Sequence, residues 1–136
     1  LFIKRLIILI PFAEKADVNL SIESDLEPKA FSKLLDIIGS NRVTVNYDTG
    51  NSASLGFDLE EELEEYGHKI SDIHIKDRLL GGGPVVLGNG VTDFKKFFKK
   101  LEELDYSGPF ILQAYRDNEG KEIFKKQLEW IKRYIN

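Results

Sequence analysis

Cysteine and methionine are absent from this sequence of 136 residues, and it contains one tryptophan and two histidines. Without cysteine the chain has no disulfide bond, no thiolate nucleophile and no zinc–thiolate site. This absence fits a reducing compartment, so we expect a cytoplasmic protein. Two histidines are also too few for a histidine-rich cluster of several metal ions.

An excess of positive charge is lacking too. The 19 Lys and Arg residues are scattered among 23 Asp and Glu residues, and the formal net charge is −4. A nucleic-acid partner would need a basic stripe to neutralise its phosphodiester backbone. We therefore expect no nucleic-acid partner.

No hydrophobic run is long enough to cross a membrane. Residues 1–10 are apolar, but they include two cations and meet Pro11 far short of the ~20 residues that a span requires. The residues that follow lack the small-residue pattern of a signal-peptide cleavage site. We expect no membrane partner. Because the sequence lacks an initiator Met, we expect its start to lie inside a longer natural sequence, with a processed or engineered terminus as the alternative.

The sequence is organised as an alternation of β-branched runs and segments with a helical spacing of apolar residues. Strands are expected at residues 18–23, 43–48, 70–76 and 110–115. Helices are expected over residues 1–15, 28–38, 59–66 and 94–104, and in a last segment that starts near Asn118, with Phe124, Leu128, Ile131 and Tyr134 facing inward.

Capping residues indicate where two of these helices begin. Asp58 is suited to cap the acidic helix before Gly67, and Thr92 or Asp93 is suited to cap the next one. The glycine-rich stretches at residues 81–84 and 88–90 lack the position and spacing of nucleotide-binding loops. We interpret them as a mobile loop and a turn.

Strand–helix–strand units of this length predict parallel strands with right-handed crossovers, that is, an α/β fold. Repetition without a phosphate fingerprint favours a (β/α)₈ TIM barrel over a doubly wound sheet. A complete barrel needs ~250 residues and eight strands. Residues 1–136 are therefore expected to form a single domain with four parallel strands, about half a barrel. Its open edges predict a homodimer, or a missing N-terminal half of the barrel.

Polar residues stand where each predicted strand ends, the rim on which α/β barrels build their active sites. Taken one per strand, they are Glu23, Asp48, His74 and Gln113. Three oxygen-bearing side chains and one imidazole suit Mn²⁺, Mg²⁺, Co²⁺ or Zn²⁺. Each has an ordinary alternative, because strand-end carboxylates are commonly helix caps and His74 could be a buried, hydrogen-bonded histidine. His68 lies in a turn and is expected to be solvated.

Several motifs carry a resemblance to a known family. The chain is similar, in order along nearly its whole length, to the closing half of the sugar phosphate isomerase/epimerase family in the xylose isomerase-like TIM barrel superfamily, which also contains endonuclease IV. The residues that carry it are Ser21-Ile22-Glu23, 46–51, 73–78, 87–90 with Asp93-Phe94, and 108–113. The resemblance implies that these strands are equivalent to strands 5–8 of the barrel.

The resemblance also implies a single divalent metal held by Glu, Asp, His and a last Glu. The first three fall on Glu23, Asp48 and His74, and the fourth position holds Gln113. The resemblance implies that the first and last Glu act as acid and base, which makes Glu23 an expected catalytic residue. We expect His74 to be catalytic as well. A Gln can offer its oxygen to a metal but cannot accept a proton, so the substitution favours isomerisation with one base over epimerisation with two.

Asn51 stands near a position where family epimerases often have His, which also favours isomerisation. Lys76, Arg78 and Arg116 are candidates, with Asn51, to bind the hydroxyls or phosphate of a sugar, although each could also be a solvated charge.

Three functions remain open at this stage. The first is a metal-dependent isomerase or epimerase that acts on a sugar or sugar phosphate through proton transfer next to a carbonyl. The second is a non-catalytic or decayed half-barrel that serves in binding or assembly, suggested by Gln113. The third is an endonuclease IV-like nuclease, which the acidic charge and the scarcity of histidine disfavour.

Overall fold

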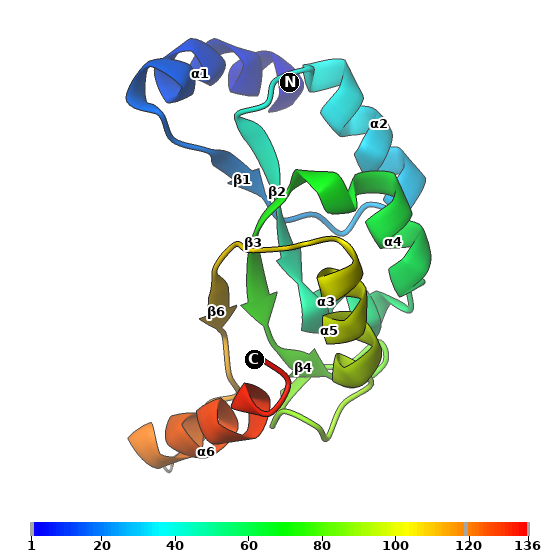
Figure 1. The fold of residues 1–136 in the computed structure, drawn as a ribbon, viewed down its shortest axis with the longest axis vertical. Coiled ribbons are helices and arrows are strands. Elements are labelled where there is room, and N and C mark those ends of the chain that lie inside the picture. The colour runs from blue at the N-terminus through cyan, green and yellow to red at the C-terminus, as the bar shows by residue number, and fades with distance from the viewer. Residues whose placement is uncertain (1, 119, 136) are drawn as a thin grey trace.

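The computed structural model describes residues 2–118 and 120–135, which alternate helices with strands along the chain (Figure 1). In the described part, no helix is both long and apolar enough to cross a membrane. In chain order the elements are α1 (Phe2–Ala16), β1 (Leu20–Ile22), α2 (Pro28–Ile38), β2 (Val43–Asp48), α3 (Thr49–Leu55), α4 (Leu59–Tyr66), the 3₁₀ helix η1 (Gly67–Lys69), β3 (Ile70–Ile75), β4 (Asp77–Arg78), β5 (Pro84–Val85), α5 (Phe94–Glu103), β6 (Phe110–Leu112) and α6 (Lys121–Lys132).

Four strands form one parallel sheet in the order β1-β2-β3-β6. The strands follow one another in chain order with helices between them, as in half of a (β/α)₈ barrel, so the predicted α/β fold is confirmed. The register places Ile22 opposite Val45 in β2, and Asp48 opposite His74 in β3. All four carboxyl ends therefore point toward the same rim.

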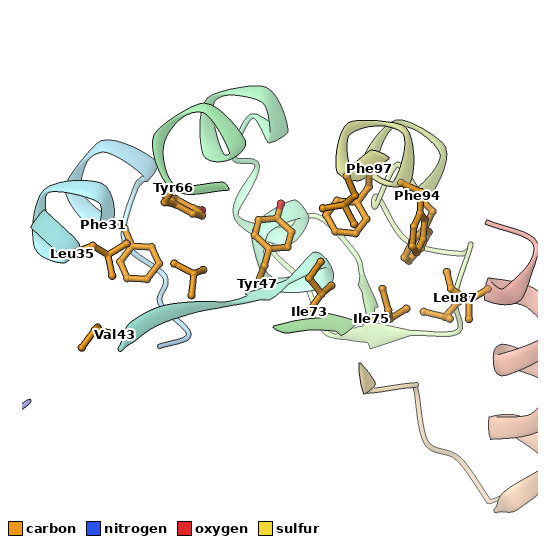
Figure 2. Packing of buried hydrophobic residues seen from close by; sticks show 14 of the residues in the cluster. Phe31, Leu35, Val43, Tyr47, Tyr66, Ile73, Ile75, Leu87, Phe94 and Phe97 are labelled. Carbon is orange, nitrogen blue, oxygen red and sulfur yellow. The ribbon is translucent and has the colours of Figure 1, made fainter. Parts of the chain in front are cut away.

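One face of the sheet is apolar and carries the core. Val45 in β2 and Ile73 in β3 are fully buried, and Tyr47 stacks on Phe97 of α5 with ring centroids 5.4 Å apart. Figure 2 shows Tyr47, Ile73 and Phe97 in one layer between the sheet and helices α2, α4 and α5. Each buried aliphatic or aromatic side chain contributes about 1.5–3 kcal/mol of hydrophobic stabilisation.

The opposite face of the sheet is polar. Alternate residues of the same strands, among them Thr44, Asn46 and His74, are half-buried there. The ladder between β2 and β3 shifts register at Val45/Asn46. Because of this irregularity, Ser71 joins the hydrogen bonds of the polar face through Thr44 Oγ1, at 2.8 Å. Bulges of this kind re-aim side chains beside functional sites.

Most of the predicted helices are confirmed. Helix α2 covers 28–38 and ends at Gly39, which has a left-handed φ of 66°. Asp58 caps α4 by accepting hydrogen bonds from the backbone of Glu60 and Glu61. Of the two candidate caps for α5, Asp93 accepts from the backbone N–H of Lys96.

The prediction for the last helix was wrong in its start and partly in its face. Helix α6 begins at Lys121, and its buried residues are Ile123, Gln127 and Ile131. Leu128, expected inward, is 41% exposed. Gln127 is buried because its side chain accepts from the backbone of Leu87 and donates to the carbonyl of Tyr115. Polar hydrogen bonding thus overrides the apolar periodicity.

The sequence also did not predict α3, or the antiparallel pair of β4 with β5 around the glycine-rich stretch 81–84. Buried Asp77 organises the loop that follows by accepting hydrogen bonds from the backbone N–H groups of Gly88, Gly90 and Thr92. A Cβ on Gly90 would lie 2.1 Å from Asp77 Oδ1, so this turn requires glycine. The segment is an anchored hairpin and turn.

Candidate metal centre at the strand ends

Three side chains from successive strands meet at the carboxyl rim of the sheet. Glu23 follows β1, Asp48 ends β2 and His74 lies in β3. Each offers one ligand atom, and these atoms all lie within 4.8 Å of one another. The parallel register produces this convergence, because it sets Asp48 opposite His74 and brings the end of β1 beside them.

The trio combines a buried and an accessible carboxylate around one imidazole. His74 Nδ1 lies 3.4 Å from Glu23 Oε2 and 3.9 Å from Asp48 Oδ2. The side chain of Asp48 is 1% exposed, that of His74 18% and that of Glu23 40%. The accessible side of the site is therefore the side of Glu23.

Asn51 holds both carboxylates. Its backbone N–H donates to Asp48 Oδ1 at 2.8 Å, where Asp48 caps α3, and its side-chain amide donates to Glu23 Oε1. The carbonyl oxygen of the Asn51 side chain accepts from Arg78 Nη1 at 2.8 Å. Arg78 is itself fixed by a hydrogen bond from Nε to the carbonyl of Gly82. A chain of hydrogen bonds thus runs from the β4–β5 hairpin to Glu23.

Asn46 orients the imidazole of His74. Its side-chain amide nitrogen lies 3.1 Å from His74 Nε2 and also donates to Asp72 Oδ2. The other ring nitrogen, Nδ1, therefore faces Glu23 and Asp48. In protein metal sites, a partner on one ring nitrogen commonly fixes the other toward the ion.

The residues fit a divalent cation. Asp48 Oδ2 and His74 Nδ1 are buried and have no hydrogen-bond partner among the described residues. Buried polar atoms without a partner are unfavourable, and a cation between them would satisfy both. Ligands at ~2.1 Å from a tetrahedral ion lie about 3.4 Å apart, which is close to the spacing of Nδ1 from Glu23.

Two of the remaining predicted site residues, Lys76 and Gln113, are related to the trio by distance or by the face of the sheet. Lys76 lies near the trio, with Nζ 3.6 Å from Asp48 Oδ2. Gln113 follows β6, where Ile111 pairs with His74, so period-two alternation puts Gln113 on the same face of the sheet as His74. Its side chain is exposed, and its backbone N–H donates to the carbonyl of Ile75.

Arg116 lies apart from the trio. It is exposed in the segment between β6 and α6, beside Lys121 and Phe124. Within the described residues, no hydrogen bond or ion pair links it to Glu23, Asp48 or His74. A role for Arg116 in substrate binding stays a prediction.

The sequence analysis missed Asn46 and Asp72, which support His74, and Glu62, which lies behind the site. A signal for the first two was present, since polar residues interrupt otherwise apolar strands at both positions. Glu62 had no such signal, because it is one of five glutamates in residues 60–65.

Glu62 is a buried carboxylate, 2% exposed. Burial raises the pKa of its carboxyl group above the ordinary value of 4.5, while hydrogen bonds from the hydroxyls of Ser52, Tyr47 and Tyr66 oppose this shift. Burial and the neighbouring carboxylate also raise the pKa of both tyrosines, which therefore remain protonated donors.

The fold and the trio define a class: half of a parallel α/β barrel with a candidate metal site at its strand ends. The model of the family described as xylose isomerase-like TIM barrel matches residues 1–134. The chain therefore belongs to this family.

Two kinds of enzyme are found among the curated relatives. The chain is 30% identical over 136 residues to a putative L-ribulose-5-phosphate 3-epimerase of Haemophilus influenzae, an alignment that covers 90% of the chain and 48% of that protein. It is 32% identical over 103 residues to an inosose dehydratase of Geobacillus kaustophilus, which covers 62% of the chain and 33% of the relative. The chain thus spans half or less of the length of these relatives.

Solved structures show the same fold. A xylose isomerase domain protein from Planctomyces limnophilus superposes with a TM-score of 0.82 at 20% identity, over 97% of the chain and 52% of that structure. IOLI protein, solved with a bound zinc atom, superposes with a TM-score of 0.72 at 17% identity, over 97% of the chain and 52% of its own.

The raised pKa of Glu62 predicts a pH-dependent effect of Glu62→Gln. A carboxyl group with a raised pKa in the folded state favours folding fully below its unfolded pKa, and this contribution is lost as the pH rises through the folded pKa. The free energy of unfolding of the wild type minus that of Glu62→Gln should therefore fall from acidic to neutral pH. Urea denaturation at several pH values measures it.

Glu64→Gln, at an exposed position of the same helix, controls for the loss of one negative charge. A difference that stays constant or grows with rising pH at Glu62 would contradict the raised pKa.

Proposed function

We propose that this chain carries the metal site of a divalent-metal-dependent isomerase or epimerase that acts on a sugar or sugar phosphate. The observation that most strongly supports this proposal is the pair of buried atoms without hydrogen-bond partners, Asp48 Oδ2 and His74 Nδ1, which face each other beside Glu23. The sugar-phosphate epimerase and inosose dehydratase among its relatives support carbohydrate chemistry of this class.

Glu23, Asp48 and His74 would hold the ion, which we propose to be Mn²⁺, Mg²⁺, Co²⁺ or Zn²⁺, and Gln113 is proposed to complete the set with its side-chain oxygen. The zinc atom in IOLI protein, which shares this fold, supports a bound divalent metal ion. A bound divalent cation would supply Lewis-acid polarisation of a substrate carbonyl or hydroxyl oxygen.

Glu23 is the proposed base, because it is the most accessible carboxylate of the trio. It would take a proton from the hydroxyl-bearing carbon beside the carbonyl and deliver it to the former carbonyl carbon, while a second proton passes from that hydroxyl to the carbonyl oxygen. The hydrogen bond from Asn51 would hold one oxygen of Glu23 in place. His74 is also a proposed catalytic residue, and it would act on the same substrate from the more buried side of the site. Lys76, Arg78 and Arg116 are proposed to bind hydroxyls or a phosphate, as is Asn51.

Gln113 decides between two reaction types in this proposal. An epimerase with two bases needs a second carboxylate on the opposite face of the substrate, and an amide cannot accept a proton at working pH. Isomerisation with Glu23 as the single base is therefore favoured. The same substitution keeps a second candidate function, a binding barrel without catalysis, as the alternative.

The open polar face and the edges of the sheet favour association of this chain with a partner. Strands β1 and β6 are the two edges of a four-stranded sheet, and unpaired parallel edges favour association. We propose that a second copy of this chain covers them when the chain is purified alone, and that an N-terminal half-barrel would take its place in a longer protein.

Metal binding should depend on His74. A cation at roughly a thousandfold excess over its dissociation constant stabilises a protein by about 4 kcal/mol, so millimolar Mn²⁺ should raise the melting temperature of the wild type. His74→Ala should abolish this rise, and His68→Ala, which changes the other histidine, should keep it. Differential scanning fluorimetry measures all three. Equal shifts in both variants would place the ion elsewhere, and no shift with any of the four metals would favour the binding barrel.

Gln113→Glu should tighten Mn²⁺ binding by roughly tenfold, because it replaces a neutral oxygen donor with a carboxylate. Isothermal titration calorimetry measures the dissociation constant. Asn89→Asp adds the same charge at an exposed turn and should leave the constant unchanged. If Gln113→Glu behaves like Asn89→Asp, the position does not face the ion.

Purified alone, the chain should be a dimer in solution by multi-angle light scattering. Ile111→Glu should yield monomers, because Ile111 is 45% exposed on the open face of edge strand β6. Leu80→Glu, which changes an exposed residue of the β4–β5 hairpin, should remain dimeric. A compact wild-type monomer would refute this assembly.

A further inference from the structure

Glu62 needs an explanation that the proposed reaction does not supply. Its carboxylate is buried between α4, α3 and β2, on the helix side of the sheet, and does not belong to the trio at the rim. Removing a charge from water costs several kcal/mol, and an apolar residue at such a position is often at least as stabilising. Stability alone is therefore a weak reason for an acidic residue here.

Three hydroxyl groups converge on this carboxylate. Tyr47 OH donates to Glu62 Oε2 at 2.7 Å, Ser52 Oγ donates to the same oxygen, and Tyr66 OH donates to Oε1 at 2.7 Å. A carboxylate accepts at both oxygens, whereas an amide accepts at only one. Only an acidic side chain of this shape can accept from all three.

Two of the three hydroxyls belong to direct neighbours of site residues. Tyr47 precedes Asp48, and Ser52 follows Asn51, the residue that donates to both Asp48 Oδ1 and Glu23 Oε1. Glu62 therefore binds Tyr47, which precedes the N-cap of α3, and Ser52, which lies at the end of the first turn of this helix. That turn carries the hydrogen bonds that hold both carboxylates of the trio.

Helix α3 depends on such contacts for its position. It has seven residues, too few to be stable by its own hydrogen bonds. Its first residue, Thr49, exchanges side-chain hydrogen bonds with the backbone of Lys76, which fixes the start of the helix. Ser52, one turn later, is fixed by Glu62.

The two groups also lie close in space. Residues of both groups line one small cavity of about 20 Å³, namely Glu23, Asp48, Asn51, Ser52 and Glu62. This volume is about that of one water-sized sphere. A shift of Ser52 would therefore be transmitted to the trio with little intervening space to absorb it.

We propose that Glu62 is a positioning residue, which through Ser52 locks the first turn of α3 and so fixes Asp48 and Glu23 in the geometry that takes a divalent cation. This inference rests on the proposed metal site and extends it to a residue behind the sheet. It assigns to the buried carboxylate a role in metal affinity in addition to its effect on stability.

The test compares three single variants. Glu62→Leu, which leaves no acceptor at this position, and Ser52→Ala should each raise the dissociation constant for Mn²⁺ by about tenfold, the size seen for residues that support metal ligands. The double variant should be no weaker than either single variant, because both remove the same contact. The control is Tyr66→Phe, which removes the donor to the other oxygen of Glu62 and should change the constant less than about twofold. Electron paramagnetic resonance of free Mn²⁺ measures the constants.

A second readout needs no metal. In the metal-free protein, hydrogen exchange of the Asn51 amide, which donates to Asp48, should accelerate about tenfold in Glu62→Leu and Ser52→Ala and remain unchanged in Tyr66→Phe. Local opening of a short helix is what such exchange reports. A role in folding alone would instead change the melting temperature of all variants without separating Tyr66→Phe from the others.

The outcomes distinguish this inference from the proposed function. If the wild type binds Mn²⁺ and Glu62→Leu binds it equally well, the inference is overturned and the metal site stands. If the wild type binds no metal, the proposed function fails, and the exchange of the Asn51 amide decides the positioning by itself. Unchanged exchange in Glu62→Leu overturns it in either case.

Discussion

The parallel pairing of β1, β2, β3 and β6 is the constraint on which the rest of this structure depends. In parallel strands the side chains of paired residues point to the same face of the sheet, and all carboxyl ends lie at one rim. Val45 and Ile73 fall on one face, and Asn46 and His74 fall on the other. A one-residue slip would bury the polar set against the helices and expose the core, so packing and site share one register.

The two faces of the sheet are also connected through α3. The apolar face carries Tyr47, whose ring stacks on Phe97 while its hydroxyl reaches Glu62. The polar rim carries Asp48, the next residue, which caps α3 and meets His74. Adjacent residues of one strand thus serve the core and the candidate site, and α3 joins them. This arrangement explains how a carboxylate behind the sheet can influence side chains at its rim.

Electrostatically, the site concentrates negative charge, part of which Lys76 compensates. Glu23 and Asp48 face one imidazole, and the ammonium of Lys76 forms an ion pair with Asp48 Oδ2 at 3.6 Å. The unsatisfied atoms lie where these charges converge. The surrounding donors, Asn51 and Asn46, are neutral amides, which orient the ligands without neutralising them.

The sequence by itself determined the architecture and the identities of the rim residues. β-branched runs at 43–48 and 70–76, and caps such as Asp58, are local signals, and parallel connectivity follows from their spacing. Glu23, Asp48 and His74 could be predicted as site residues because the ends of the strands can be located in the sequence of a barrel. Only the tertiary structure decided which neighbours hold them. Asn46, Asn51 and Glu62 act through contacts with residues 10 to 28 positions away. The hydrogen bonds of Gln127 determined which face of α6 is buried. Such contacts depend on how elements pack in three dimensions, so they cannot be predicted from the periodicity of a single segment.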